Sequence, residues 1–307
     1  MDNMAQGRAR QAPLSECNQA PVEIVSQDGV VLRGTRFGLP EAPVVVLLHG
    51  GGQTRHAWTD TAHLLAASGF CAVSMDARGH GDSDWCPRGD YSADALVGDL
   101  RAILGSFSSP PYLVGASMGG LTALLTLGED HTLDCRGLVL VDVAARLESD
   151  GVRRIIEFMR QHTAGFESLE QARDAVTAYN PTRKASASPA GLLKNLRHAP
   201  DGRLFWHWDP AFLSDVSTDG SGKGMFAPAR LDRAAARLTL PVLLIRGFHS
   251  DVLSEEGARD LLARIPQARY QVVEQAGHMV VGDRNNAFTH AVLEFLKHAG
   301  DTSSANT

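Results

Sequence analysis

The chain has 307 residues, a formal net charge of −6, 44% hydrophobic residues and 21% charged residues. These values are ordinary for a globular protein, and the length suits one large α/β domain or a domain that carries a sizeable insertion. A mildly acidic balance without long basic runs argues against nucleic acid and anionic membrane as main partners. Composition and charge do not exclude small neutral molecules as ligands.

The cysteines and the chain ends indicate the cellular compartment. The four cysteines are scattered and form no C-x-x-C pair, so the sequence predicts neither a zinc cage nor a disulfide framework. Residues 1–20 contain no continuous apolar segment of a signal peptide, and no window approaches the roughly 18 apolar residues of a membrane span. We therefore expect a cytoplasmic protein with mobile polar ends at residues 1–20 and 299–307.

Apolar, β-branched runs recur along the chain, with helical patterns between them. The middle runs are almost continuously hydrophobic, which suits strands buried on both faces of a parallel sheet. The helical patterns carry end signals, such as Gly69 after one segment and Ser254 before another. The alternation predicts a doubly wound α/β sheet. Strands are expected at Val30–Phe37, Pro43–His49, Phe70–Asp76, Pro111–Gly115, Gly137–Asp142, Pro241–Gly247 and Arg269–Glu274.

The alternation stops between about Ala144 and Arg230, where no strand-like run appears and helical patterns dominate. We expect residues 144–230 to form a helical insertion, and residues 21–143 and 231–298 to form the α/β core. Trp206 and Trp208 lie in this insertion. We expect them to pack it onto the core instead of contacting a ligand, because large aromatic side chains serve cores more often.

The segment GASMG, residues 115–119, matches the G-x-S-x-G pattern of a nucleophile elbow. A buried strand precedes it and a small-residue helix start follows, as the pattern requires. Glycine permits close backbone approach at such a turn, which leaves Ser117 exposed at the carboxyl edge of the sheet. A serine hydroxyl is a poor nucleophile at neutral pH, so the chain must also supply a base, an acid and an oxyanion site.

His278 is the expected base, because it lies in the loop after the last predicted strand and before a predicted helix. Asp251 directly follows the strand Pro241–Gly247, which gives the chain order serine, aspartate, histidine. A carboxylate there would accept the Nδ1 proton of His278 and stabilise the imidazolium. Asp142 is a competitor because it also ends a strand at the catalytic edge. Loop position favours Asp251.

The expected oxyanion site lies in the segment LLHGGGQ, where three adjacent glycines follow the strand Pro43–His49. Glycines leave backbone N–H groups accessible to the negative oxygen that develops during acyl transfer. We expect the amides of Gly51 and of Met118, the residue after the nucleophile, to be the donors.

Together these segments resemble the α/β-hydrolase superfamily over about Val22 to His298. The matching elements are HGGG at 49–52, DARGHGDS at 76–83, GASMGG at 115–120, Asp251, and GHM at 277–279. The resemblance implies an α/β-hydrolase fold, with a mostly parallel central sheet flanked by helices and a helical cap inserted after the sixth strand. It also implies Ser117 as nucleophile, His278 as base, Asp251 as acid, and the amides of Gly51 and Met118 as oxyanion donors.

The insertion resembles the cap of the branch that contains esterases, haloperoxidases, epoxide hydrolases and carbon–carbon-bond hydrolases. Epoxide hydrolases and haloalkane dehalogenases have aspartate at the elbow, so Ser117 favours acyl transfer over an alkyl-enzyme mechanism. GASMG also lacks the acidic residue that precedes the serine in the hormone-sensitive-lipase group. Asp76 and Arg78 in DARGHGDS are expected to hold a loop and not to act in catalysis.

The sequence therefore predicts a serine hydrolase that needs no cofactor or metal and cleaves a small or medium carboxylic ester. Lactone hydrolysis, carbon–carbon cleavage and perhydrolysis use the same triad and stay open. A non-catalytic receptor for a small molecule ranks below them, because the triad residues are all present.

Overall fold

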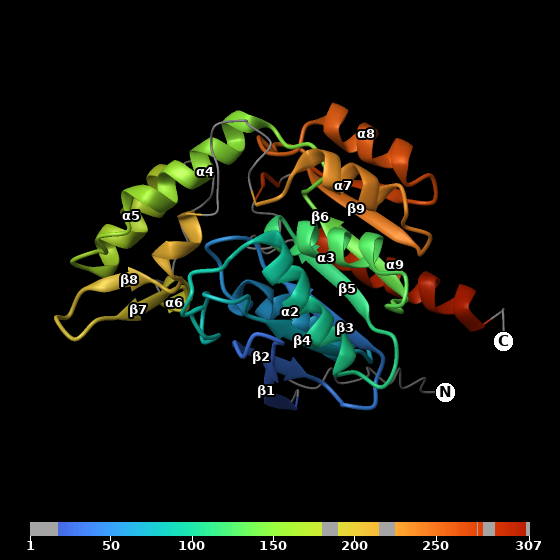
Figure 1. Ribbon diagram of the computed structural model, residues 1–307, viewed down its shortest axis with the longest axis horizontal. Coiled ribbons are helices and arrows are strands. Elements are labelled where there is room, and N and C mark those ends of the chain that lie inside the picture. The colour runs from blue at the N-terminus through green and yellow to red at the C-terminus, as the bar shows by residue number, and fades with distance from the viewer. Residues whose placement is uncertain (1–17, 180–189, 215–224, 275, 279–285, 305–307) are drawn as a thin grey trace, which may run out of the picture.

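A computed structural model describes residues 18–179, 190–214, 225–274, 276–278 and 286–304 (Figure 1). Its centre is an eight-stranded sheet in the order β1-β2-β4-β3-β5-β6-β9-β10. The strands from β4 to β10 pair in parallel, and β2 pairs antiparallel with both β1 and β4. The strands are β1 (Gln19–Val25), β2 (Val31–Phe37), β3 (Val44–Leu48), β4 (Cys71–Met75), β5 (Tyr112–Ala116), β6 (Gly137–Val141), β9 (Val242–Gly247) and β10 (Arg269–Val273).

Helices cover both faces of this sheet, and alternate side chains along each strand supply the two cores. On β3, for example, Val44 and Val46 join the core that contains α2, α3, α7 and α8, whereas Val45 and Leu47 join the core that contains α1 and α9. A strand buried on both faces must be apolar at every position, which explains the continuous runs. The flanking helices are η2 (Arg55–Trp58), α1 (Thr59–Ala67), α2 (Ala93–Gly105), α3 (Met118–Glu129), α7 (Pro228–Ala235), α8 (Glu255–Arg264) and α9 (Asn286–Ser304).

Each of the seven predicted strand runs contains a strand, and the predicted mostly parallel α/β sheet is confirmed. Two predicted helix ends are also confirmed. Gly69 has φ +88°, a backbone conformation that favours glycine, just after α1. The Ser254 hydroxyl accepts the N–H of Gly257 at 3.1 Å and so caps the start of α8.

The expected chain ends need two corrections. Strand β1 begins at Gln19, inside the segment predicted to be mobile, and α9 continues to Ser304, past the predicted end of the core at residue 298. Strand β1 is an edge strand whose residues alternate between exposed and half-buried, so it lacks the apolar run that reveals the inner strands. The rest of both predicted tails, residues 1–17 and 305–307, lies outside the described residues.

The segment after β6 forms a separate layer over one end of the sheet (Figure 1). It contains a short antiparallel ribbon, which corrects the expectation that the insertion has no strand. The ribbon strands have three residues each, too few to show an alternating pattern. The elements of this cap are α4 (Ser149–Gln161), α5 (Leu169–Tyr179), α6 (Ala190–Leu193), β7 (Leu196–His198), β8 (Leu204–Trp206) and η3 (Pro210–Ser214).

The cap ends earlier than predicted, because α7 starts at Pro228 and packs closely on α3 of the core. A Cβ placed on Gly128 of α3 would lie 2.3 Å from the carbonyl oxygen of Ala234 in α7. Glycine is therefore required where the two helices touch.

Trp206 and Trp208 are both buried, as expected for residues that pack the cap. Trp206 contacts Phe158 and Phe166 of the cap, with ring centroids 5.9 and 5.1 Å apart. Trp208 forms a backbone bridge with His80 of the core. One tryptophan thus fills the cap interior, and the other joins the cap to the core.

Candidate active site

The turn at Ser117 has the sharp geometry that the glycine pattern predicts. Ser117 links β5 directly to α3 with φ +46°, a left-handed conformation that is rare outside glycine. A Cβ on Gly115 would lie 2.6 Å from the N atom of Gly120, and a Cβ on Gly119 would lie 2.6 Å from the carbonyl oxygen of Leu48. The glycines therefore allow the helix start to lie against two strands. Such strain is typical of functional residues, where surrounding packing maintains it.

His278 lies against a buried carboxylate at the end of β6. Its Nδ1 lies 2.7 Å from Oδ2 of Asp142, whose side chain is buried. Asp142 also has a left-handed backbone, with φ +51°. Aspartate tolerates this conformation better than most residues. The carboxylate can accept the Nδ1 proton, which leaves Nε2 free to act as a base.

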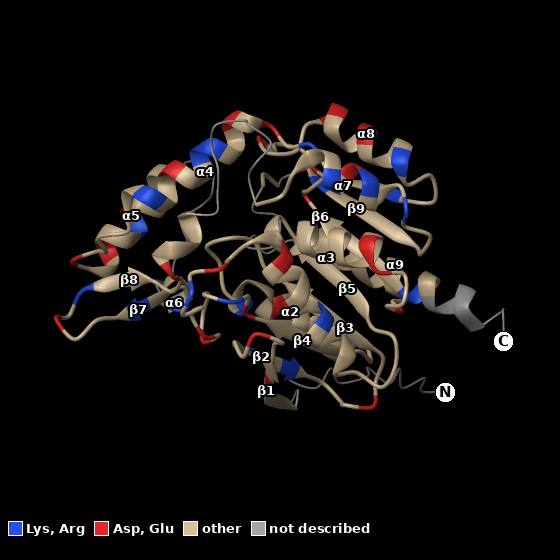
Figure 2. Cartoon of the chain, viewed as in Figure 1, with Lys and Arg blue, Asp and Glu red and all other residues tan. Residues whose placement is uncertain are grey.

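The expectation that Asp251 pairs with His278 is corrected by this contact. Asp251 instead forms an ion pair with Arg154 of α4, a helix along which acidic and basic residues alternate (Figure 2). The Asp251 side chain is about one-third exposed, whereas that of Asp142 is almost fully buried. Since β6 and β9 are neighbouring parallel strands, the two carboxylates follow the same edge of the sheet. Asp142, the competitor in the sequence, is the one that contacts the histidine.

The loop after β9 still serves the site, through residues that the sequence analysis did not single out. The Ser250 hydroxyl donates to Oδ2 of Asp142 at 2.5 Å and accepts the N–H groups of Val252 and Leu253. The N–H of Gly247 donates to Oδ1 of Asp142 at 2.8 Å. Both carboxylate oxygens are therefore held in place, which fixes the acceptor presented to His278.

Ser117 and Asp142 are neighbours across two strands. The N–H of Ser117 donates to the carbonyl oxygen of Val141 at 3.2 Å, and Asp142 is the next residue. Ser117 is thus bonded through its backbone to the residue before Asp142, the aspartate that contacts His278. The Ser117 hydroxyl forms no hydrogen bond with any residue in the described ranges, His278 included. In many enzymes that bond tightens only when substrate is bound.

The glycine loop after β3 lies beside the nucleophile turn. A Cβ on Gly50 would lie 3.4 Å from the Cβ of Ser117. In this loop the N–H of Gly50 donates to the Gln53 side chain at 3.1 Å, and the N–H of Gly52 donates to His80 Nε2 at 3.1 Å. Within the part of the chain that the structure describes, the N–H groups of Gly51 and Met118 have no acceptor. An oxyanion site needs backbone N–H groups without an acceptor of their own, and these two meet that requirement.

Two fully buried histidines, His49 and His80, support this loop. Each ring uses one nitrogen as donor and the other as acceptor, so each is neutral. The pKa of His80 is lowered to about 3, mainly by burial and also by the neighbouring His49 and His207. The hydrogen bond to the Arg78 carbonyl acts in the opposite direction. Burial also lowers the pKa of His49.

This burial predicts an acid-sensitive fold. Between the ordinary histidine pKa of 6.5 and about 3, unfolded chains bind a proton at residue 80 that the folded protein does not. The free energy of unfolding should therefore fall by about 1.4 kcal/mol per pH unit in that window from His80 alone. His49 adds to the slope. Urea unfolding at about pH 7 and about pH 5 measures it. His80→Gln should reduce the slope, and an unchanged slope would contradict this account.

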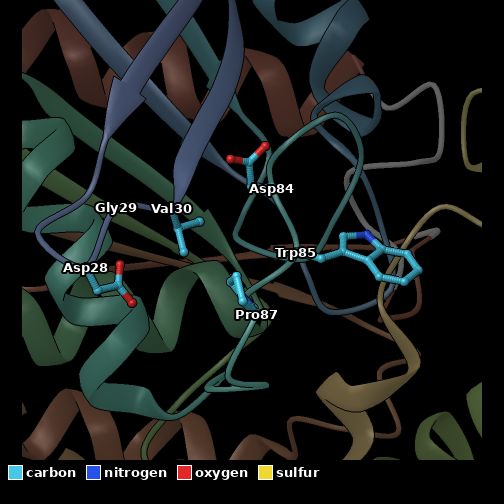
Figure 3. A pocket seen from close by; sticks show the side chains of 6 residues that line it. All are labelled: Asp28, Gly29, Val30, Asp84, Trp85 and Pro87. Carbon is cyan, nitrogen blue, oxygen red and sulfur yellow. The ribbon is translucent and has the colours of Figure 1, made fainter.

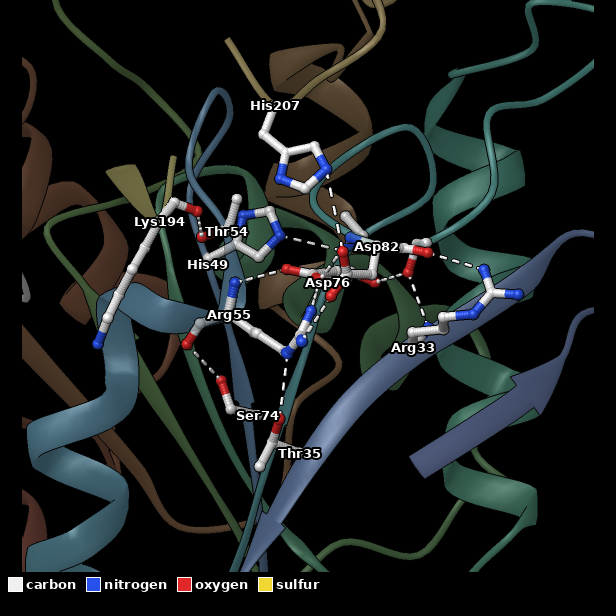
Figure 4. Close-up of polar contacts among 12 residues, drawn as sticks. Arg33, Thr35, His49, Thr54, Arg55, Ser74, Asp76, Asp82, Lys194 and His207 are labelled. Carbon is white, nitrogen blue, oxygen red and sulfur yellow. Dashed lines mark hydrogen bonds and ion pairs between the residues drawn. The ribbon is translucent and has the colours of Figure 1, made fainter. Parts of the chain in front are cut away.

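Asp76 and Arg78 both hold loops, as expected. Asp76 is fully buried and accepts from the backbone N–H of Arg55 at 2.6 Å and from that of Asp82 at 3.0 Å, besides its ion pair with the Arg55 guanidinium (Figure 4). Arg78 is buried against Asp99 at 2.6 Å. The first ion pair connects the segments after β3 and β4, and the second ties the loop after β4 to α2.

A surface hollow of about 320 Å³ opens elsewhere on the core (Figure 3). Its two carboxylates already have arginine partners, because Asp28 pairs with Arg78 and Asp84 pairs with Arg33. None of the site residues above lines it. The lining residues are Asp28, Gly29, Val30, Asp84, Trp85 and Pro87.

Neither a metal-binding cluster nor a membrane-spanning helix occurs in the described ranges. There, no cluster of three or more histidine, cysteine or acidic residues is arranged to hold a metal ion. None of the helices in those ranges combines the length and apolarity needed to cross a bilayer.

Comparison with known proteins places this geometry in a family. The model of the alpha/beta hydrolase family matches residues 45–291. Esterase Rv0045c of Mycobacterium tuberculosis is 30% identical over 270 residues, which are 85% of this chain and 84% of the relative. A solved structure of that esterase covers 94% of this chain and 93% of its own, with a TM-score of 0.71 and 27% identity.

A further relative is the probable protein phosphatase methylesterase 1 of Caenorhabditis elegans. It is 28% identical over 251 residues, which are 79% of this chain and 66% of the relative. The chain thus spans slightly less than two thirds of that protein. With the family model matched over most of the sheet and the sheet order in place, the chain belongs to the α/β-hydrolase family and is an enzyme of that family.

Proposed function

We propose that the chain hydrolyses small or medium carboxylic esters through an acyl-enzyme. Ser117 is the nucleophile, His278 the base and Asp142 the acid, and the amides of Gly51 and Met118 bind the oxyanion. The observation that carries the proposal is the 2.7 Å contact between His278 Nδ1 and the buried Asp142, one residue beyond the strand position that pairs with Ser117. A histidine whose Nδ1 faces a buried carboxylate, close in the fold to the turn of a strained serine, supports an activated nucleophile.

The reaction follows from these positions. His278 Nε2 takes the hydroxyl proton as Ser117 Oγ attacks the ester carbonyl, and Asp142 stabilises the imidazolium. The two amides bind the developing negative oxygen, each contributing about 3 kcal/mol. The alcohol leaves with the proton from Nε2, and a water molecule, deprotonated by His278, then releases the acid and frees Ser117.

The substrate class rests on the relatives and on the cap. The relatives named above are an esterase and a methylesterase, and both names denote attack on an ester bond. Cap side chains also lie over the glycine loop: a Cβ on Gly51 would lie 3.4 Å from the ring of Phe212, and one on Gly52 would lie 3.0 Å from Met159. An apolar roof this close to the oxyanion amides favours an uncharged acyl group of modest size.

The proposal is tested by covalent labelling and by turnover. A fluorophosphonate probe should add one label per chain, and peptide mapping should place it on Ser117. The same protein should release nitrophenol from p-nitrophenyl acetate, and prior labelling should abolish that release. Labelling elsewhere, or nitrophenol release that survives complete labelling of Ser117, would overturn the proposal.

A further inference from the structure

Two buried histidines bond to the residues on either side of Gly51, the proposed oxyanion donor. His49 Nδ1 donates to the carbonyl oxygen of Gly50 at 2.8 Å, and His80 Nε2 accepts the N–H of Gly52 at 3.1 Å. The two rings are themselves in contact, with centroids 5.3 Å apart. The peptide groups on both sides of Gly51 are therefore held by imidazoles.

These contacts control which way the Gly51 amide points. The carbonyl of Gly50 and the N–H of Gly51 belong to one planar peptide group and point in opposite directions. Fixing that carbonyl through His49 fixes the amide, and fixing the Gly52 N–H through His80 fixes the next peptide plane. Three successive glycines have little conformational preference of their own, and Gly52 has φ +74°. The order comes from Gln53 of the loop itself, whose N–H donates to the Gly50 carbonyl oxygen at 3.2 Å, and from the two imidazoles.

The second nitrogen of each ring is also used, which fixes the tautomers. His80 Nδ1 donates to the carbonyl oxygen of Arg78 at 3.0 Å, so its Nε2 is an acceptor. His49 Nε2 accepts the N–H of Ala77 at 3.0 Å, so its Nδ1 is a donor. With the pKa of His80 lowered to about 3 by burial, the ring stays an acceptor at neutral pH.

The segment that carries His80 is tied to the cap as well. The N–H of Gly81 donates to the carbonyl oxygen of His207 at 2.7 Å, and the N–H of Asp209 donates to that of Gly79 at 2.7 Å. Segment 79–81 thus contacts residues 207–209, directly after β8 of the cap, through its backbone, and it contacts the glycine loop through the His80 side chain.

We propose that His80 is a positioning residue of the oxyanion hole, which acts with His49 to fix the peptide groups on either side of Gly51. The proposal rests on the proposed function, because it assigns the Gly51 amide to the developing oxyanion. His80 lies outside the glycine motif and is bonded to the loop through the N–H of Gly52.

The test compares His80→Ala and His80→Gln with the wild-type chain. His80→Ala removes the acceptor and should lower kcat for p-nitrophenyl acetate by about 10- to 100-fold, with KM changed by less than about threefold. Affinity for a trifluoromethyl ketone, whose adduct carries the oxyanion, should fall in parallel with kcat/KM. His80→Gln offers a side-chain oxygen as acceptor and should recover part of the loss.

His207→Gln is the matched control. Its ring lies in the same region, 3.9 Å from Asp82 (Figure 4), and its contact with segment 79–81 is made by the backbone. It should keep kcat within about twofold of wild type. Amide hydrogen exchange provides a readout independent of turnover. Exchange in residues 50–53 should rise in His80→Ala and stay unchanged in His207→Gln.

The outcomes separate this proposal from the proposed function. Wild-type kcat in His80→Ala, or an equal loss in His207→Gln, overturns the role of His80 and leaves ester hydrolysis intact. Exchange that rises throughout the chain also overturns it, because the effect would then be general unfolding. If the wild-type chain cleaves no ester, the proposed function fails, and local exchange at 50–53 still decides whether His80 holds the loop.

Discussion

Ser117→Ala is expected to lower kcat for p-nitrophenyl acetate by about 10⁵- to 10⁶-fold, the loss typical of serine hydrolases that lose their nucleophile. Without the hydroxyl no acyl-enzyme can form, and His278 has no proton to accept from the chain. The oxyanion amides of Gly51 and Met118 remain, so a residual rate of about 10³-fold over water is expected. Steady-state kinetics with a discontinuous assay for slow turnover would measure both.

The fold should survive this substitution, which makes the kinetic loss interpretable. The Ser117 hydroxyl has no hydrogen-bond partner among the residues that the structure describes, and alanine suffers the same strain at φ +46°. The melting temperature should change by no more than about 2 °C. Ser117→Gly provides the matched control: it should be as inactive, yet more stable by about 1 kcal/mol because glycine adopts positive φ without strain. Equal rates in wild type and Ser117→Ala would rule out Ser117 as nucleophile.

The inner sheet could be predicted from sequence because its physics is local. A parallel strand buried on both faces must be apolar throughout, so runs such as Val44–Leu48 are visible in the sequence. Strand β1 has only one neighbouring strand and alternates in burial, and β7 and β8 are three residues long, so none of the three shows such a run. The continuous runs therefore revealed the inner strands, whereas β2 and the edge strand β10 are partly exposed and were predicted from their β-branched residues.

The candidate active site could likewise be predicted only in part from the sequence. The turn at Ser117 follows from glycine spacing over five residues. The partner of His278 does not, because β6 and β9 bring both Asp142 and Asp251 to one edge of the sheet. The choice depends on contacts distant in the chain: Arg154 of the cap pairs with Asp251, and Ser250 and Gly247 hold Asp142. Neither of these contacts can be inferred from chain order or loop position.

Support for the oxyanion loop was also hidden in the sequence. His80 lies 28 residues from Gly52, inside the DARGHGDS segment, which the sequence indicated only as a loop held by Asp76 and Arg78. The signal that identifies it is three-dimensional: a fully buried imidazole with both ring nitrogens bonded to backbone. A search for such histidines in related structures would find this kind of residue where motif matching does not.

Asp142→Asn is expected to lower kcat by about 10⁴-fold while leaving the fold intact. Asparagine tolerates the left-handed backbone at φ +51°, and its side-chain oxygen can still accept the N–H of Gly247. Its amide nitrogen then replaces the oxygen that faces His278 Nδ1, and it donates where an acceptor is required. His278 is thereby held with its proton on Nε2, the tautomer that cannot accept the proton of Ser117.

Asp251→Asn is the matched control, since it makes the same chemical change at the same edge of the sheet. It removes one charge from an ion pair with Arg154 whose members are about one-third and more than half exposed, so kcat should stay within about threefold of wild type. The two kcat values, with melting temperatures for both variants, decide which carboxylate serves His278. A large loss in Asp251→Asn, with Asp142→Asn close to wild type, would contradict this assignment and make Asp251 the acid.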